Sequence, residues 1–154
     1  MRTIAEQEER RQKMSSRTLR PVSLSTVPGS EPCERLLDPH ITCLECDLSA
    51  NRAIALLDAS GLTSAPVVDD NSVLVGVVTI RSLVSMMGRE DLEVEDAMAM
   101  NPVTATPRTS IAEVAQLMAK NDLQVLPIVT DDGHLLGIVS AMDVVKWLAQ
   151  RIES

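Results

Sequence analysis

The stretch Ser64–Thr79, SAPVVDDNSVLVGVVT, returns 61 positions later as Val125–Ser140, VLPIVTDDGHLLGIVS. In both copies a proline lies near the start, a glycine lies near the end, and a hydroxyl residue comes last. Each copy has two β-branched runs separated by an Asp-Asp turn, which predicts a β-hairpin. Self-similarity at a fixed offset indicates two copies of one structural unit.

The similarity continues on both sides of each hairpin. Apolar residues spaced i, i+3, i+4, i+7 predict an amphipathic helix before and after it. Ser110 and Glu113 form a capping-box pattern, and Gly61 is a helix stop signal. The upstream sets are Ala50, Ala53, Ile54, Leu57 and Ile111, Val114, Ala115, Met118; the downstream sets are Ile80, Leu83, Val84, Met87 and Ala141, Val144, Val145, Leu148.

A short strand is expected to open each unit, near Thr42 and near Thr104. Ile41-Thr42 matches Val103-Thr104 at an offset of 62, which predicts one extra residue within Cys43–Leu48. Each unit is therefore β-α-β-β-α, and the fold class is α/β (α+β). One unit of about 50 residues cannot bury its sheet alone, whereas two units packed sheet to sheet would.

Composition excludes several classes of protein. Hydrophobic residues make up 45% of the 154 residues, which favours a globular chain over a disordered one. A net charge of −8 and an aromatic content of 1% argue against nucleic-acid binding. No apolar run approaches the roughly 18–20 residues of a membrane span, and Met1–Arg20 lacks the apolar core of a secretory signal. With three cysteines, a reduced cytoplasmic protein is expected.

The N-terminal part differs in charge from the rest. Residues 1–20 carry about +3, and Pro21–Pro32 has the composition of a linker. The tail is either a solvated helix or an arm that binds a partner or clasps a dimer. We therefore divide the chain into a basic tail and linker (1–33), a first repeat (34–90) and a second repeat (91–154).

The repeated pattern resembles a tandem pair of cystathionine β-synthase-type (CBS) domains, from about Glu34 to Arg151. The residues that carry the resemblance are Val94–Met98, Asn101–Thr104, Leu126–Val129 and Gly137–Asp143. The resemblance implies a pseudo-twofold sandwich with two clefts that bind adenosine-containing ligands, such as AMP, ADP, ATP or S-adenosylmethionine. It also implies a regulatory role, no enzymatic activity, no cofactor and a homodimer.

Ser140 and Asp143 are the sharpest candidates for a ligand site. Ser140 ends a strand and opens a helix, whose free N–H groups and dipole favour an anion. Asp143 lies one turn later, where its carboxylate suits a ribose diol. The resemblance implies phosphate and ribose contacts at these two positions; an ordinary helix cap is the alternative. It also implies that the adenine lies in the same cleft, lined by Thr104, Ala105, Val125 and Pro127; plain core packing is the alternative for these four residues.

The first repeat departs from this pattern. Thr79 corresponds to Ser140, but Ser82 stands where Asp143 does. The cleft expected from Thr42, Pro66, Thr79 and Ser82 is therefore weaker or empty. Arg81 and Arg108 are either phosphate contacts or solvated surface residues.

The cysteines admit a second interpretation. Cys33, His40, Cys43 and Cys46 form a conceivable four-ligand metal set, although small buried thiols explain Cys43 as well. His134 lies in a hairpin turn and is expected to be exposed. We predict a regulatory module that binds an adenosine ligand and acts on a second copy or on an unidentified protein. The alternative is a ligand-free interaction or dimerisation module with vestigial clefts.

Overall fold

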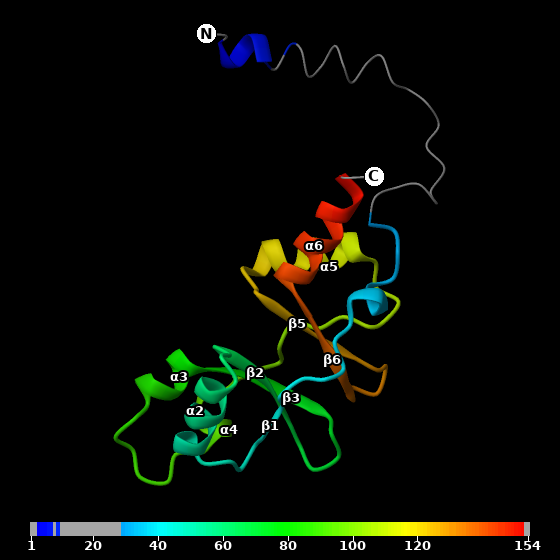
Figure 1. Ribbon diagram of the computed structural model, residues 1–154. Coiled ribbons are helices and arrows are strands. Elements are labelled where there is room, and N and C mark those ends of the chain that lie inside the picture. Colours follow the sequence, from blue (N-terminus) through cyan, green and yellow to red (C-terminus); the bar gives the residue numbers. More distant parts are fainter. Residues whose placement is uncertain (1–2, 8, 10–28, 153–154) are drawn as a thin grey trace.

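The computed structural model describes residues 3–7, 9 and 29–152 (Figure 1). Most of the basic tail and its linker, residues 10–28, lies outside the described residues, so the expectations for this part stay predictions. Among the described helices, none combines the length and hydrophobicity that a membrane crossing requires.

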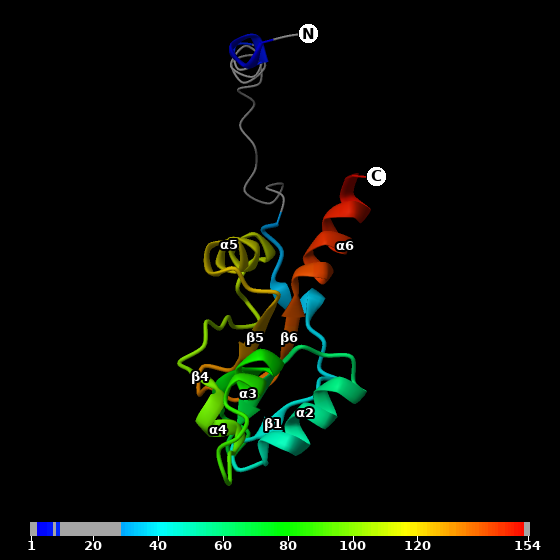
Figure 2. The same cartoon turned by 90° about the vertical axis from the view of Figure 1, so that its left-hand side faces the viewer.

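The body of the chain has two lobes, with helices at the outer ends and strands in the middle (Figures 1 and 2). The predicted β-α-β-β-α order is confirmed in both repeats, although the second opening strand is reduced to a parallel bridge between Ala105 and Ile128. The first repeat contains β1 (Leu44–Glu45), α2 (Ala50–Ala59), β2 (Ser64–Val68), β3 (Leu74–Thr79) and α3 (Ile80–Ser85). The second contains α5 (Ile111–Asn121), β5 (Val125–Val129), β6 (Leu135–Ser140) and α6 (Ala141–Ile152).

Local sequence signals set the helices that cover the strands. The capping box of α5 is confirmed: Glu113 N–H donates to Ser110 Oγ at 3.1 Å, and Ser110 N–H donates to the Glu113 carboxylate at 3.4 Å. Gly61 has a φ of +68° just after α2, a conformation that glycine adopts without strain. The predicted stripes of α2 and α5 face the cores, with Ala50, Ala53, Leu57, Ile111, Val114 and Met118 buried.

The helices that follow the hairpins differ from the prediction. α3 ends at Ser85, so Met87 of the predicted stripe lies outside it, and Val84 is 49% exposed. α6 has its full length, but none of its residues is fully buried, and Val145 is 54% exposed. The outer part of each stripe therefore faces away from the core.

The two repeats exchange the segments that lie just before them in the chain. The segment before the first repeat packs on the second, and the segment before the second packs on the first. We call residues 31–41 and 92–102 the first and second leading segments. The first contains η2 (Cys33–Leu36), and it packs on the second repeat, where Cys33 is fully buried. The second contains α4 (Val94–Ala97) and β4 (Ala99–Met100), and it packs on the first repeat, where Val94 is fully buried. In Figure 1 the first leading segment runs beside β6 before the chain continues to β1.

The exchange is symmetric, because its contacts recur at the offset of 61 residues. Cys33 N–H donates to Thr109 O at 2.7 Å, and Val94 N–H donates to Leu48 O at 2.9 Å. The two hairpin turns meet through a bridge between Val73 and the exposed His134, which are themselves 61 positions apart. A pseudo-twofold axis therefore relates the two halves. The exposure expected for His134 is confirmed.

The extra residue predicted within Cys43–Leu48 is wrong. Leu44 pairs in parallel with Val67, as Ala105 does with Ile128, so the offset is 61 at the opening strands as well. The match of Ile41-Thr42 to Val103-Thr104 at an offset of 62 is thus a coincidence of similar residue types. The structural counterpart of Thr42 is Val103.

Two glycines allow the leading segments to cross the hairpins closely. A Cβ placed on Gly137 would overlap the carbonyl oxygen of Asp38, and one on Gly76 would lie 2.7 Å from the carbonyl oxygen of Ala99. Backbone approaches backbone at both crossings, and Asp38 pairs with Ile138 there through two hydrogen bonds. A side chain at either glycine would force the two segments apart.

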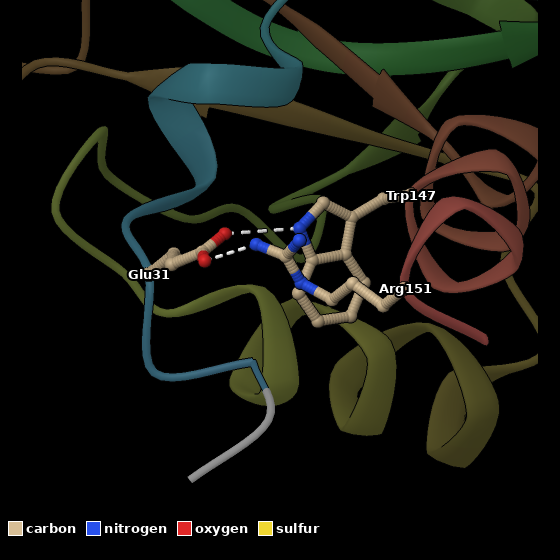
Figure 3. Close-up of polar contacts among 3 residues, drawn as sticks. All are labelled: Glu31, Trp147 and Arg151. Carbon is tan, nitrogen blue, oxygen red and sulfur yellow. Dashed lines mark hydrogen bonds and ion pairs between the residues drawn. The ribbon is translucent and has the colours of Figure 1, made fainter. Parts of the chain in front are cut away.

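The first leading segment is also fastened to α6 by Glu31 (Figure 3). The Glu31 carboxylate accepts a hydrogen bond from Trp147 Nε1 at 3.0 Å and pairs with the guanidinium of Arg151. That guanidinium lies 4.3 Å from the centre of the Trp147 ring, a cation–π distance. Chiefly the Trp147 hydrogen bond, together with Arg151, lowers the pKa of Glu31.

We expect Gly137→Ala to destabilise the protein by about 1–3 kcal/mol, because the added methyl group overlaps the backbone of the leading segment. The comparison is Leu136→Ala on the same strand, where the side chain is 38% exposed and the cost should be about 0.5 kcal/mol. Urea denaturation measures both. An alanine at 137 that leaves stability unchanged would contradict the close crossing. Without an overlap, replacing glycine by alanine does not destabilise a protein, because it lowers the conformational entropy of the unfolded chain.

We expect Glu31→Gln to lower the melting temperature at pH 7 and to have progressively less effect as the solution is acidified. The folded state lowers the pKa of Glu31, so its contribution is present above the unfolded value of about 4.3 and is lost as the pH falls through the folded pKa. Trp147, the one tryptophan of the chain, reports the transition by fluorescence. Glu34→Gln, at an exposed glutamate of the same segment, is the control; an equal effect of both variants would contradict the assigned contact.

Candidate functional site

Two clefts lie between the repeats. The first, of about 680 Å³, contains Ser140 at the start of α6, and we call it the Ser140 cleft. The second, of about 700 Å³, contains Thr79 before the start of α3, and we call it the Thr79 cleft. Both volumes fall in the range of small-molecule sites.

The two clefts are equivalent positions of the pseudo-twofold frame. Ser60–Ser64 and Pro66 line the Ser140 cleft, and the residues 61 positions later, Asn121–Val125 and Pro127, line the Thr79 cleft. Thr63, Ser64, Gln124 and Val125 line both, so these two dipeptides form the wall between the clefts.

The structure groups the predicted residues differently from the sequence analysis. Ser140 shares its cleft with Thr42 and Pro66 of the first repeat, and Pro127 lies with Thr79 in the other cleft. Of the residues predicted to share a cleft with Ser140, only Val125 lines the same cleft. The reason is that the repeats face each other across the axis, so the helix start of one repeat lies opposite the strands of the other.

Thr104 and Ala105 line neither cleft. Ala105 is 6% exposed and belongs to the core of the second repeat, with its N–H bonded to Pro127 O at 3.1 Å. Val103 lines the Thr79 cleft instead, because it is the counterpart of Thr42. The register error of one residue explains why Val103 was not predicted, but Val103 itself lies with Thr79 and not with Ser140, because the repeats face each other across the axis.

Ser140 lines its cleft and forms a reciprocal cap with Asp143, which is not itself among the residues that line the cleft. Asp143 N–H donates to Ser140 Oγ at 3.0 Å, and Ser140 N–H donates to Asp143 Oδ2 at 2.9 Å. Asp143 is half-buried, and its second oxygen, Oδ1, has no hydrogen-bond partner among the described residues. The hydroxyl proton of Ser140 and the free carboxylate oxygen are thus available to a ligand.

The counterpart in the first repeat is closed on itself, and Ser82, predicted for the Thr79 cleft, is not among the residues that line it. Ser82 Oγ donates to Thr79 O at 2.9 Å and lies 3.1 Å from Thr79 Oγ1, while Ser82 N–H donates to Thr79 Oγ1 at 3.0 Å. The predicted absence of a carboxylate is therefore accompanied by a neutral, internally bonded cap. Arg81 lines this cleft, whereas the exposed Arg108 lines neither.

Several cleft residues were missed by the sequence analysis. Asp38 and His40 line the Ser140 cleft from the first leading segment, and Asn101 and Asp122 line the Thr79 cleft. A uniform offset of 61, extended back to Cys33, would have paired His40 with Asn101. It would not have shown which repeat each leading segment packs against.

The cysteines do not converge. Cys33 is fully buried and its thiol donates to Thr106 O at 3.1 Å; burial raises the pKa of this thiol. Cys46 donates to Val68 O at 3.3 Å, and Cys43 is exposed, so the expectation that it is buried is wrong. Within the described part of the chain, no three His, Cys, Asp or Glu side chains are placed to hold a metal ion.

Comparisons with known proteins agree with the fold. The CBS domain family matches residues 33–89 and 94–150. CBSX2, a CBS-pair protein from Arabidopsis thaliana, is similar in structure. Its complex with AMP is 27% identical, with a TM-score of 0.73 over 80% of this chain and 99% of that one.

Two further similarities involve parts of larger proteins. The cytosolic domain of the Mg²⁺ channel MgtE, in complex with ATP, is 28% identical with a TM-score of 0.69, over 77% of this chain and 49% of that one. Inosine-5'-monophosphate dehydrogenase of Methanocaldococcus jannaschii is 31% identical over 120 residues, which is 78% of this chain. The chain spans 24% of that dehydrogenase, and 43% and 37% of two other curated relatives from the same archaeon.

Proposed function

The chain belongs to the CBS domain family, with two such domains in tandem, and from this premise we propose that it is a regulatory module that binds an adenosine-containing ligand in the Ser140 cleft. The Ser140–Asp143 cap, whose Ser140 lines a cleft of about 680 Å³, carries the proposal. The likeness to CBSX2, which was solved with AMP, supports the ligand class.

The expected contacts of the ligand follow from the lining and from the cap that Asp143 forms with Ser140. Asp143 Oδ1 accepts hydrogen bonds from the ribose hydroxyls, and Ser140 and the N–H of Met142 bind the group at the 5′ position. The N–H of Met142 suits this role because no hydrogen bond within the described residues uses it. Pro66 and Val125 form aliphatic walls for the adenine. Aliphatic walls are needed because the chain has no Tyr or Phe.

The output of the module is a change in protein association rather than catalysis. α6 begins at the ligand and continues to an exposed surface, so a ligand that fixes its first turn alters the surface that the helix presents. The regulated protein is either a second copy of this chain or an unidentified partner.

We expect Asp143→Ala to weaken adenosine or AMP binding by at least about tenfold, measured by calorimetric titration. Charge-assisted hydrogen bonds to the ribose are worth about 1.5–3 kcal/mol, and 1.4 kcal/mol corresponds to tenfold. Ser140→Ala should have an intermediate effect, because it removes a hydroxyl but keeps the helix N–H groups.

Ser82→Ala is the matched control, since it changes the equivalent position of the other repeat. It should leave this binding unchanged. If Ser82→Ala weakens binding while Asp143→Ala binds like the wild type, the ligand lies in the Thr79 cleft and the assignment is inverted.

A second function, homodimerisation, is favoured by the exposed apolar face of α6. Met142, Val145, Leu148 and Ile152 recur along this helix at 58%, 54%, 48% and 76% exposure. Figure 2 shows α6 extending away from the strands toward its C-terminal end. Apolar residues at this spacing form one stripe, and a second copy of α6 would bury it.

We expect light scattering at tens of micromolar to give the mass of a dimer. The double variant Val145→Asp/Leu148→Asp should be monomeric, because carboxylates cannot be buried unpaired in the interface. Lys146→Asp, which places a carboxylate outside the stripe of the same helix, should remain a dimer. A wild-type monomer under these conditions would contradict the proposal.

A further inference from the structure

The two leading segments are held by the same backbone hydrogen bonds. We call the contact between a leading segment and the repeat on which it packs a seam. At each seam the segment donates two N–H groups to residues just after the opening strand, and it accepts one N–H from the helix that follows. The donor–acceptor pairs, all between 2.7 and 3.1 Å, are Cys33–Thr109, Glu34–Pro107 and Ile111–Glu31 in the second repeat, and Val94–Leu48, Glu95–Cys46 and Ala50–Leu92 in the first. A difference between the seams must therefore come from side chains.

The first leading segment has a side-chain clasp that the second lacks. The Glu31 carboxylate binds Trp147 and Arg151 of α6, as Figure 3 shows. The residues at the equivalent positions of the other seam are Leu92, Met86 and Glu90. Leucine and methionine side chains cannot form a hydrogen-bonded ion pair. The clasp therefore holds only the seam of the second repeat.

The charged residues at the two seams also differ in sign. Glu34 N–H is bonded to the residue beside Arg108, and Arg35 follows in the same segment, so charges of both signs meet at the seam of the second repeat. The equivalent residues at the seam of the first repeat are Glu95, Asp47 and Asp96. All three are acidic, and like charges that face each other oppose the contact.

The carboxylates at the seam of the first repeat act on one another. Glu93 is half-buried, and its N–H donates to Asp96 Oδ2 at 2.9 Å. Burial, and then the carboxylates of Glu95, Asp96 and Asp47, raise the pKa of Glu93. The equivalent position at the other seam is the uncharged Pro32. The second leading segment thus brings an additional carboxylate into an acidic contact.

This negative charge extends to the hairpin of the first repeat. The Cys46 thiol lies at the seam, and burial, followed by Glu95 and Asp69, raises its pKa. The basic residues of the surrounding elements are Arg52 in α2 and Arg89 in the loop before the segment. Both are exposed, and neither forms an ion pair with a described residue. Among the described residues, the carboxylates at this seam are therefore not neutralised by ion pairs.

We propose that the second leading segment is a movable strap that detaches from the first repeat ahead of global unfolding, while the first leading segment stays bound. Repulsion among its carboxylates opposes docking, and no clasp offsets it. Residues 99–102 of this segment line the Thr79 cleft. Detachment therefore opens that cleft, and protonation or screening of the carboxylates closes it. The inference does not depend on a ligand in the Ser140 cleft.

Acid should act in opposite directions on the two seams. The pKa of Glu93 is raised in the docked state, so the docked segment binds a proton more tightly than the detached one. Docking of the second leading segment therefore strengthens as the pH falls through that pKa. The pKa of Glu31 is lowered, so its clasp is fully present above the ordinary glutamate value of about 4.3 and weakens below it.

The test is hydrogen exchange of single amides in the full chain at pH 7, followed by NMR. The N–H groups that donate across the seams are the reporters: Val94 and Glu95 for the second leading segment, and Cys33 and Glu34 for the first. We expect the protection factors of Val94 and Glu95 to be at least about tenfold lower than those of Cys33 and Glu34. Lowering the pH from 7 to 5, or adding salt, should raise the first two and not the other two.

Asp47→Arg introduces the residue that the other seam has at the equivalent position. It should raise the protection factor of Val94 at least about tenfold and leave that of Cys33 unchanged. Asp47→Asn, which only removes the charge, should have a smaller effect in the same direction. Arg108→Asp is the matched control, because it makes the other seam acidic; it should lower the protection of Cys33 and leave that of Val94 unchanged.

Two results would overturn the proposal. If Val94 and Cys33 have equal protection factors in the wild type, both segments are released only by global unfolding. If Val94 exchanges in Asp47→Arg and Asp47→Asn as it does in the wild type, charge at the seam does not control docking.

Discussion

The close crossing of each leading segment over the hairpin of the opposite repeat is the contact on which the rest of the structure depends. At Gly76 and Gly137 there is no Cβ to hold the two backbones apart, and the segments pair. The pairing brings Cys33, which lies just before the first repeat, into the core of the second repeat. It likewise brings Val94, which lies after the first repeat, back into the core of the first. Because two such crossings are related by one axis, they fix how the repeats face each other, and therefore where the clefts open.

The symmetric backbone sets the positions of the two clefts, whereas the side chains that differ between the repeats set their chemistry. The offset of 61 places the clefts at equivalent positions, so both receive a helix start from one repeat and strands from the other. The chemistry of each cleft is then decided by a few side chains at the helix start. A cap made of Ser140 and Asp143 presents a carboxylate, whereas a cap made of Thr79 and Ser82 uses its hydroxyls internally.

α6 connects the cleft to the N-terminal side of the fold. Its first turn forms the Ser140 cap, and its last turns contribute Trp147 and Arg151, which hold Glu31 of the first leading segment. The outer face between these two ends is apolar and exposed. A single helix thus carries the proposed ligand contact, the contact with the leading segment and the proposed dimer surface.

The sequence by itself determined the repeat, the order of elements, the capping box of Ser110 and the positions of Thr79 and Ser140 at helix starts, because these depend on local periodicity and on hydrogen bonds between residues three apart. It also placed Ser140 at a cleft. Only the tertiary structure decided that Ser140 faces Thr42 and Pro66 rather than Thr104 and Pro127. Residue spacing within one repeat carries no information about which strands lie across the axis. The exchange of leading segments, and with it the position of Asp38 and His40 at the cleft, follows from a backbone crossing between residues about 100 positions apart, such as Asp38 and Ile138.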